Sequence, residues 1–254
     1  MMRSRARLVV EADERSRSVV RELRSHAPLT LLPRRRREEP SGAVVVHLVG
    51  SATSPLGGDD LDLDVHVGAG ARLLLRGTAA TLALPGHRPG GSRGSVRIEV
   101  ADGGTVEYLP EPTVVTSRAE HEAELSVRMG EHARLCCREV LVLGRSGERP
   151  GRLRSRLELE RAGTALLRNG FDTADSRLRD SHAYLGGARV LATEAVVWDR
   201  DPVECSGDGW ALMPLAGGGA LSTVLAGDVV TAGDALSRAR AAHPCGEELS
   251  PVAG

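Results

Sequence analysis

Strict alternation of apolar and polar residues dominates the middle of this chain. In residues 60–67 every odd position is apolar and every even position is polar, and residues 95–100, 124–129 and 156–160 repeat the pattern. A strand places successive side chains on opposite faces, so each segment predicts a β-strand with one buried face. The alternation therefore predicts an all-β fold with a repeated β core over about residues 43–200.

A strand–turn–strand unit recurs inside this region. The copies begin at residues 63 (LDVHVGAGARLLLR), 96 (VRIEVADGGTVEYL) and 125 (LSVRMGEHARLCCR). Short turns containing Gly and Asp are typical of hairpins, so we expect each unit to be a hairpin. Recurrence about every thirty residues favours a solenoid or β-helix-like stack with one shared core. Residues 156–167 fit a fourth, degraded copy, and an ordinary β-meander is the alternative.

The flanking regions have a different character. Short strands are expected around residues 7–10 and 19–23, and the charged, proline-bounded residues 33–40 predict a surface loop. Residues 201–254 are rich in Gly and Ala, which predicts a looser C-terminal part of a single domain spanning residues 1–254.

One helix is expected in this C-terminal part, near residues 234–242. Asp234 is the expected N-cap, and Pro244 ends the helical pattern. Residues 246–254 are expected to form a loose tail.

Composition excludes several classes of function. The chain has 33 basic and 34 acidic residues, which gives no general electrostatic reason to bind nucleic acid or an acidic membrane. Every basic residue is Arg, which excludes Schiff-base lysine chemistry and a phosphate-loop lysine. No apolar run is long enough for a membrane span, and no signal peptide is recognisable, so we expect a cytoplasmic protein.

The four cysteines fit that compartment. Cys136 and Cys137 are adjacent and should lie on opposite faces of a strand, where they cannot bond to each other. Together with Cys205 and Cys245 they predict mostly buried thiols of a cytosolic protein, with a soft-metal site as the alternative.

Motifs of catalysis are absent from the sequence. No GxSxG, HExxH, GxGxxG or Walker-A pattern occurs, and the eight histidines are scattered rather than paired at metal-ligand spacing. The chain is therefore expected to be a binding scaffold and not an enzyme.

Acidic residues are the strongest candidates for chemistry. Asp60, Asp62 and Asp64 share one strand face, where a solvated face is favoured over a divalent-cation site. Asp59 follows Gly57-Gly58, and a turn there would present its carboxylate to a ligand.

Three glutamates occupy unusual positions. Glu111 lies between two prolines in residues 108–113, which suits a presented carboxylate or a rigid turn. Glu139 shares a strand face with apolar residues, so it needs a partner, for which Arg138 or Arg145 is the candidate. Glu148 accompanies Arg145 in a turn, which predicts a surface ion pair.

These segments, in this order, resemble the UreD/UreH family of urease accessory proteins over about residues 5–170. The resemblance is carried by residues 27–29 (APL), 57–63 (GGDDLDL), 71–73 (ARL), 78–81 (TAAT), 106–113 (VEYLPEPT), Glu139, 143–145 (LGR) and 147–148 (GE). Residues 76–78 (RGT) and 82–84 (LAL) depart from the family pattern, so polar contacts are not transferred there.

The resemblance implies a largely β, helix-like solenoid with a couple of α-helices and a non-catalytic chaperone function in urease nickel-site assembly. It implies binding to apo-urease and to a UreF-like partner, through which the GTPase UreG is recruited with nickel. GTP hydrolysis then accompanies nickel insertion, and carbon dioxide supplies the carbamate on the urease lysine. A nickel path through the UreD-like subunit is also implied.

Carried over by position, the acids of a transient nickel path are Asp59, Glu111, Glu139 and Glu148. Partner contacts are expected along the same edges, at Asp60, Tyr108, Pro110, Pro112 and Arg145. No tightly bound cofactor is expected.

Two other functions stay open from the sequence. One is a carbohydrate-active enzyme on a β-solenoid that uses Asp60, Asp62 or Asp64, against which the aromatic content of 2% argues. The other is a nickel-binding storage module, which tight nickel binding by the isolated chain would favour.

Overall fold

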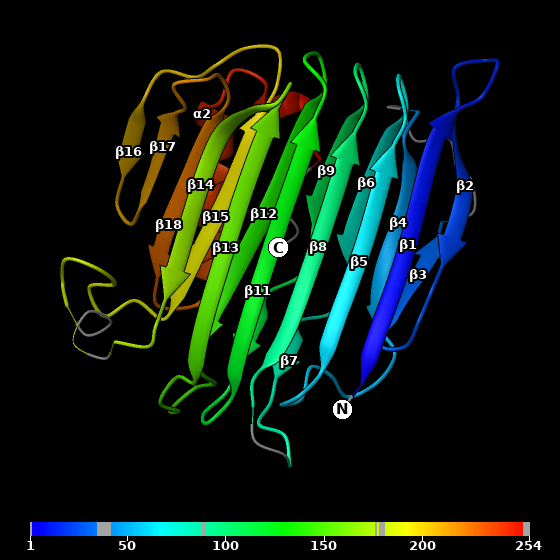
Figure 1. Ribbon diagram of the computed structural model, residues 1–254. Helices are drawn as coiled ribbons and strands as arrows, with labels where there is room; N and C mark the ends of the chain where they lie inside the picture. Colours follow the sequence, from blue (N-terminus) through cyan, green and yellow to red (C-terminus); the bar gives the residue numbers. More distant parts are fainter. Residues whose placement is uncertain (1, 35–41, 88–89, 176, 178–180, 251–254) are drawn as a thin grey trace.

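Two β-sheets packed face to face form the body of the protein (Figure 1). The computed structural model describes residues 2–34, 42–87, 90–175, 177 and 181–250. The seven-stranded sheet has the order β14 (Thr164–Asp172), β13 (Arg152–Arg161), β11 (Glu120–Met129), β8 (Ser92–Val100), β5 (Asp60–Val67), β1 (Arg3–Ala12) and β2 (Ser18–Arg24). The predicted all-β, solenoid-like class is confirmed, and the strands expected near residues 7–10 and 19–23 are present.

The eleven-stranded sheet lies behind the first in Figure 1. Its main path has the order β16 (Cys205–Gly207), β17 (Trp210–Pro214), β18 (Ala220–Ala226), β15 (Val190–Val197), β12 (Arg134–Leu143), β9 (Thr105–Leu109), β6 (Arg72–Gly77), β4 (Val44–Gly50) and β3 (Leu29–Pro33). The short strands β7 (Thr81–Ala83) and β10 (Thr113–Val115) pair with each other, and β10 also pairs with β12. Helix α2 (Val229–Ala242) packs against β15, β17 and β18.

The repeated unit is an arch between the sheets and not a hairpin. β5 pairs with β1 and β8 in one sheet, whereas β6 pairs with β4 and β9 in the other. The turns from β8 to β9 and from β11 to β12 cross between the sheets in the same way. The expectation of hairpins is therefore wrong, because the strands that each turn joins bond to neighbouring copies instead of to each other.

Stacking of the copies follows the alignment of their sequences. Leu63 is in register with Val96, and Val96 is in register with Leu125, in parallel strands. The fourth copy is only half a unit. β13 continues the parallel stack, but the chain reverses at Ala162 and Gly163, both with positive φ, and β14 returns antiparallel in the same sheet.

Apolar positions of the alternating strands fill the space between the sheets. Leu63, Val65 and Val67 of β5 belong to one buried cluster with Leu73 and Leu75 of β6. Burial of a Leu or Val side chain contributes about 1.5–3 kcal/mol, so this interior is the main source of stability. Inward-facing polar groups are therefore the positions that require a separate explanation.

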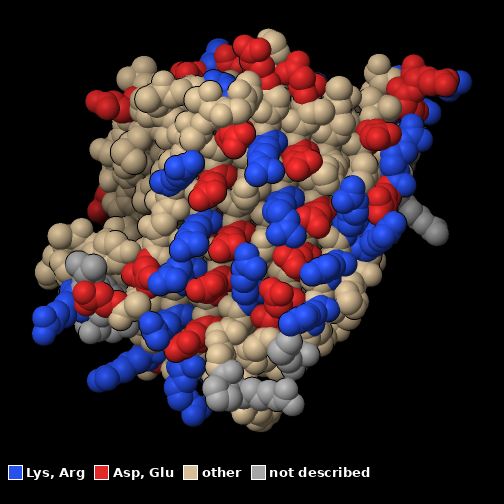
Figure 2. Space-filling model, in the orientation of Figure 1, with Lys and Arg blue, Asp and Glu red and all other residues tan. Residues whose placement is uncertain are grey.

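The outer face of the seven-stranded sheet carries alternating positive and negative side chains (Figure 2). Arg97 lies 3.2 Å from Asp62 and 2.7 Å from Asp64, because the parallel register places opposite charges side by side. The expected strand face of Asp60, Asp62 and Asp64 is the outer one, but Asp60 is half-buried and Asp62 is only 9% exposed, because neighbouring side chains cover them. Ion pairs whose arginine is exposed to solvent, as Arg97 is, contribute about 0–1 kcal/mol each.

The C-terminal region is more ordered than expected. β16, β17 and β18 extend the larger sheet, and α2 begins at Val229, five residues before the expected start. Asp228 is the N-cap and accepts a hydrogen bond from the Thr231 amide at 2.9 Å. The expected cap, Asp234, lies inside the helix, so that prediction is wrong.

The chain end packs onto the sheet as well. A 3-10 turn covers Gly246–Glu248, Leu249 is buried, and the Ser250 amide donates to Glu107 at 2.8 Å. The expected loose tail is therefore wrong for residues 246–250, whereas 251–254 lie outside the described residues. Most of the expected loop, residues 35–40, also lies outside them. In the described part of the chain, no helix is long and apolar enough to cross a membrane.

Candidate functional site

A row of small residues leaves space between the two sheets. Gly94 of β8, Ala123 of β11 and Ser155 of β13 are neighbours in register on the inner face of the seven-stranded sheet. On the other side, Gly77 ends β6 without a side chain. A cavity of about 180 Å³ forms here, and residues of both sheets line it. The apolar core is thus interrupted at one level of the stack.

Glu139 occupies this level of the interior. Alternation along β12 turns Glu139 inward with Cys137 and Leu141, and the Ser155 hydroxyl lies 2.8 Å and 2.7 Å from its two carboxylate oxygens. Removal from water raises the pKa of Glu139 from 4.5 to about 7, although the hydrogen bond from Ser155 opposes the rise. Among the described residues no cation forms an ion pair with it.

The expected arginine partners of Glu139 bind elsewhere. Arg138, the next residue, lies on the opposite face of β12 and donates to Glu194 at 3.0 Å. Arg145 pairs with Glu148 at 2.7 Å in the following turn. The predicted ion pair at Glu139 is therefore wrong, and the predicted pair between Arg145 and Glu148 is confirmed.

Tyr108 lines the same cavity from β9. Burial raises the pKa of its hydroxyl, and the negative charge of Glu139 raises it further. The phenol is therefore neutral at pH 7 and can offer an oxygen without a charge. Glu139 and Tyr108 thus present two oxygen groups to this cavity, and so few oxygen donors suit weak contact with a hard cation better than tight binding.

Glu111 lies where this cavity meets a second one. The second cavity, of about 380 Å³, lies between the outer face of the eleven-stranded sheet and α2, and Pro110 and Glu111 line both cavities. A Cβ at Gly77 would collide with the backbone nitrogen of Glu111, so the loop passes over the end of β6 only because residue 77 is Gly. Glu111 is thus at one mouth of the interior.

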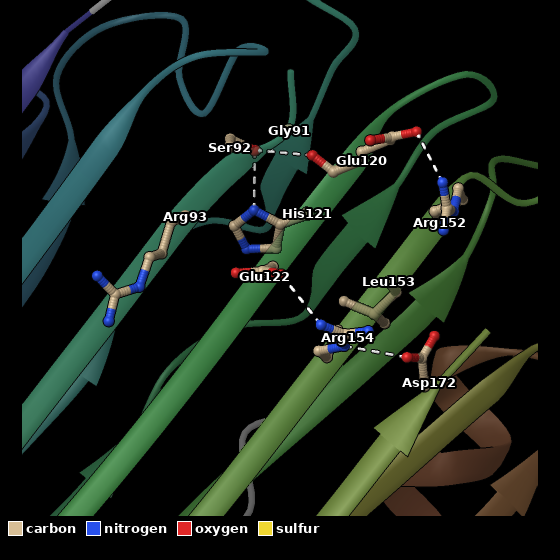
Figure 3. Close-up of a pocket in the computed structure, with 10 residues that line it drawn as sticks. All are labelled: Gly91, Ser92, Arg93, Glu120, His121, Glu122, Arg152, Leu153, Arg154 and Asp172. Carbon is tan, nitrogen blue, oxygen red and sulfur yellow. Dashed lines mark hydrogen bonds and ion pairs between the residues drawn. The ribbon is translucent and has the colours of Figure 1, made fainter. Parts of the chain in front are cut away.

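His121 lies at the opposite side of the interior. It lines the internal cavity and also a third cavity, of about 370 Å³, at the end of the seven-stranded sheet. In Figure 3 its ring points toward Ser92, whose hydroxyl oxygen lies 2.9 Å from Nδ1. Burial lowers the pKa of His121 to about 4, so its imidazole is neutral at pH 7 and able to bind a cation through nitrogen.

His121 was not among the residues expected to matter. Alternation in β11 places His121 on the inner face with Ala123 and Leu125, and this pattern is the sequence signal that indicates a buried histidine. On the outer side, ion pairs border its cavity: Glu120 with Arg152 at 3.3 Å, and Arg154 with Asp172 at 3.0 Å (Figure 3).

Asp59 is not presented to a ligand, contrary to expectation. It is 4% exposed and accepts hydrogen bonds from the Met2 amide at 2.7 Å, the Ser54 hydroxyl at 2.9 Å and the Leu56 amide at 3.0 Å. These bonds hold its pKa below the usual value against the effect of burial. The carboxylate fastens the N-terminal strand to the turn before β5.

The remaining expected residues are dispersed. Glu148 accepts hydrogen bonds from Arg145 and from the Ser117 amide and lies outside the internal cavity. Asp60 begins β5 on the charged outer face, and Pro112 lines only the cavity beside α2. Of the four acids expected on a metal path, the structure brings Glu111 and Glu139 to one cavity.

Three of the four cysteines, Cys136, Cys137 and Cys245, are buried, and Cys205 is half-buried. Cys136 and Cys137 are buried on opposite faces of β12, in different clusters, and Cys136, Cys137, Cys205 and Cys245 are all free. Burial raises the pKa of both adjacent thiols. No group of three or more His, Cys, Asp or Glu in the described part of the chain could hold a metal ion.

Comparison with known proteins gives a consistent result. The family model described as "UreD urease accessory protein" matches residues 2–244. A protein of Saccharopolyspora erythraea named "Urease accessory protein UreD 1" is 59% identical over 98% of both chains. Proteins named "Urease accessory protein UreD" are 43% identical in Frankia alni, over 76% of this chain and 72% of that one, and 39% identical in Streptomyces avermitilis, over 90% and 92%.

Proposed function

This chain belongs to the UreD family of urease accessory proteins, and we propose that it is a non-catalytic scaffold for urease maturation. In this proposal it binds apo-urease and a UreF-like accessory protein, and a UreG-like GTPase joins through the UreF-like partner. The four free cysteines support assembly in a reducing compartment, the cytoplasm.

The internal cavity is the observation that carries a more specific role. We propose that nickel passes between the sheets, in contact with Glu139 and Tyr108, and enters or leaves beside Glu111. His121 offers a neutral nitrogen at the other side of the same space. Sparse donors of this kind can pass a cation on, because each holds it too weakly to trap it.

Two predicted acids are not part of the proposed path. The carboxylate of Asp59 is committed to three hydrogen bonds, and Glu148 is committed to Arg145 and Ser117. We propose that both are structural.

The alternative functions find less support. Of the three aspartates that a carbohydrate-active enzyme could use, Asp60, Asp62 and Asp64, the last two pair with Arg97 on the charged outer face. For a nickel store, a cluster of three or more ligands would be expected, and the described residues contain none.

Co-purification tests the scaffold. The tagged full-length chain is recovered from cells that co-express the urease operon, and the bound proteins are identified by mass spectrometry. We expect apo-urease and the UreF-like protein to co-purify with the chain. Recovery of neither would contradict the proposal.

Urease activation tests the path separately. Glu139→Gln removes the charge in the cavity, and Glu158→Gln removes an exposed acid on the outer face of β13 as the matched control. We expect the first variant to keep both partners but to yield urease with less nickel and lower activity, and the control to match the wild type. Normal nickel content with Glu139→Gln would refute the path and leave the scaffold standing.

A further inference from the structure

Two buried arginines share one carboxylate beneath helix α2. Arg138 of β12 and Glu194 of β15 are partners in register, and Arg240 of α2 reaches the same Glu194. The side chains of Arg138, Glu194 and Arg240 are 8%, 2% and 6% exposed. Arg240 contacts both oxygens of Glu194, with its Nε 3.0 Å from Oε1, so this carboxylate already has a bidentate partner.

Arg138 is therefore left with an incompletely matched charge. Its Nε donates to Glu194 at 3.0 Å, but its Nη2 is buried and has no hydrogen-bond partner among the described residues. A buried guanidinium nitrogen without an acceptor is unfavourable, because it has lost water and gained nothing in return.

A second arginine lies on the same outer face of the sheet. Arg76 of β6 is in register with Leu109 of β9, and β9 lies between β6 and β12. The Nε of Arg76 is also buried without a partner in the described structure. Arg76 and Arg138 both line the cavity of about 380 Å³ beside α2.

The rest of the cavity wall is mostly apolar. Val140 lines it from the sheet, and Val229, Val230 and Leu236 line it from the helix, with Val230 72% exposed. The cavity therefore combines an aliphatic wall with two arginines that each have one buried nitrogen without an acceptor among the described residues.

Two acids line the same cavity, Glu111 and Asp234. In the described structure neither forms an ion pair with Arg76 or Arg138 within 4.0 Å, so the unpartnered Nε of Arg76 and Nη2 of Arg138 stay available. The two negative charges lower the affinity for an anion and restrict the site to a ligand of low charge.

We propose that this cavity binds a carboxylate group attached to a short aliphatic body. The planar guanidinium groups of Arg138 and Arg76 match the planar carboxylate, and the aliphatic body packs against Val140 and α2. A free short-chain acid and the C-terminal residue of a polypeptide present the same group. The site does not depend on the passage of nickel through the interior.

Calorimetry on the purified full-length chain at fixed ionic strength tests the site with two matched pairs of probes. The first pair is butyrate and the uncharged butyramide, and the second is a tetrapeptide ending in Val with a free or an amidated C-terminus. We expect saturable binding with a Kd of about 1 mM for at least one acid, and at least tenfold weaker binding of its amide. The pair that shows this difference identifies the source of the carboxylate.

Four variants locate the binding. Arg76→Gln is expected to weaken binding about tenfold, whereas Arg156→Gln, on the outer face of the other sheet, is expected to leave it unchanged. Glu111→Gln is expected to tighten it, because it removes a competing charge. Arg138→Lys tests the second guanidinium while keeping a cation beside Glu194, and retention of the wild-type unfolding transition shows that it folds.

Three results would overturn the proposal. The first is that no acid saturates the wild-type chain. The second is that Arg76→Gln and Arg138→Lys both bind like the wild type. The third is that only Glu111→Gln binds, which would mean that Glu111 itself occupies the arginines in the native protein.

Discussion

The carboxylate of Glu139, on a half-buried residue that faces the interior, leads to a prediction about stability that is independent of any partner. Its pKa is raised from 4.5 to about 7 by burial, so the folded protein binds a proton at this site that the unfolded chain releases. Between these pH values the folded state holds more protons, and stability therefore falls as pH rises. A rise of this size corresponds to about 3 kcal/mol, at about 1.4 kcal/mol per pH unit.

Glu139→Gln removes this dependence while keeping a side chain of similar size that can still hydrogen-bond to Ser155. We expect the free energy of unfolding of the variant to rise progressively above that of the wild type from pH 5 to pH 8.5. The gain should reach about 3 kcal/mol, which for a chain of this length is a shift of roughly 6–12 °C in Tm. Urea unfolding and thermal scans across this pH range measure the difference.

The difference between the two proteins is the informative quantity. His121, whose pKa is lowered to about 4, changes stability in the opposite direction, because the unfolded chain binds its proton more readily below pH 6.5. That effect is present in both proteins and cancels. Glu158→Gln, at an exposed position, should show no such trend. A constant difference between Glu139→Gln and wild type from pH 5 to pH 8.5 would refute the reasoning that Glu139 titrates in a buried site.

Four further substitutions test other parts of the structure. Asp59→Ala leaves three donors without their acceptor and should lower the free energy of unfolding by at least about 2 kcal/mol in urea titration. An unchanged unfolding midpoint would contradict the role of Asp59 in holding the N-terminal strand to the turn before β5. Asp228→Ala should lower the free energy of unfolding by about 1 kcal/mol, whereas Asp234→Ala should leave it nearly unchanged. The reverse order would show that Asp234, and not Asp228, is the N-cap of the helix. Ala123→Leu should fill the internal cavity, lower the free energy of unfolding by about 1–3 kcal/mol, and reduce the nickel content of co-expressed urease. Full nickel loading of urease would argue against passage between the sheets.

The sequence predicted the stacking of the repeats better than their connections. The alignment of Leu63, Val96 and Leu125 is the register in which β5, β8 and β11 pair. The turns gave no means to distinguish an arch from a hairpin, because both use Gly and positive φ, as at Gly70 and Gly103. Which strand each segment bonds to is a long-range property that local turn chemistry does not encode.

The sequence predicted the part of the candidate site that depends on a single strand, and not the part that depends on how the two sheets pack. Glu139 was identified because a carboxylate on an apolar strand face requires a partner, and that argument needs only the sequence of one strand. Its partner, Ser155, faces it from the other sheet, and that pairing depends on how the two sheets pack. Ser155 and Ala123 were recognisable only as small inward residues on neighbouring strands, once the strand order is known.

Alternation along β12 separates two environments of opposite charge. Arg138 and Glu139 are consecutive, so their side chains lie on opposite faces of the sheet and cannot pair, although a reading of charges along the chain favours that pair. Among the described residues, the carboxylate on the inner face therefore pairs with no cation, and the guanidinium on the outer face lacks a full complement of acceptors. Glu111 lines the cavities on both sides. A charge at that position acts on both sides of the sheet, so removal of Glu111 should weaken contact with cations inside and strengthen contact with anions outside.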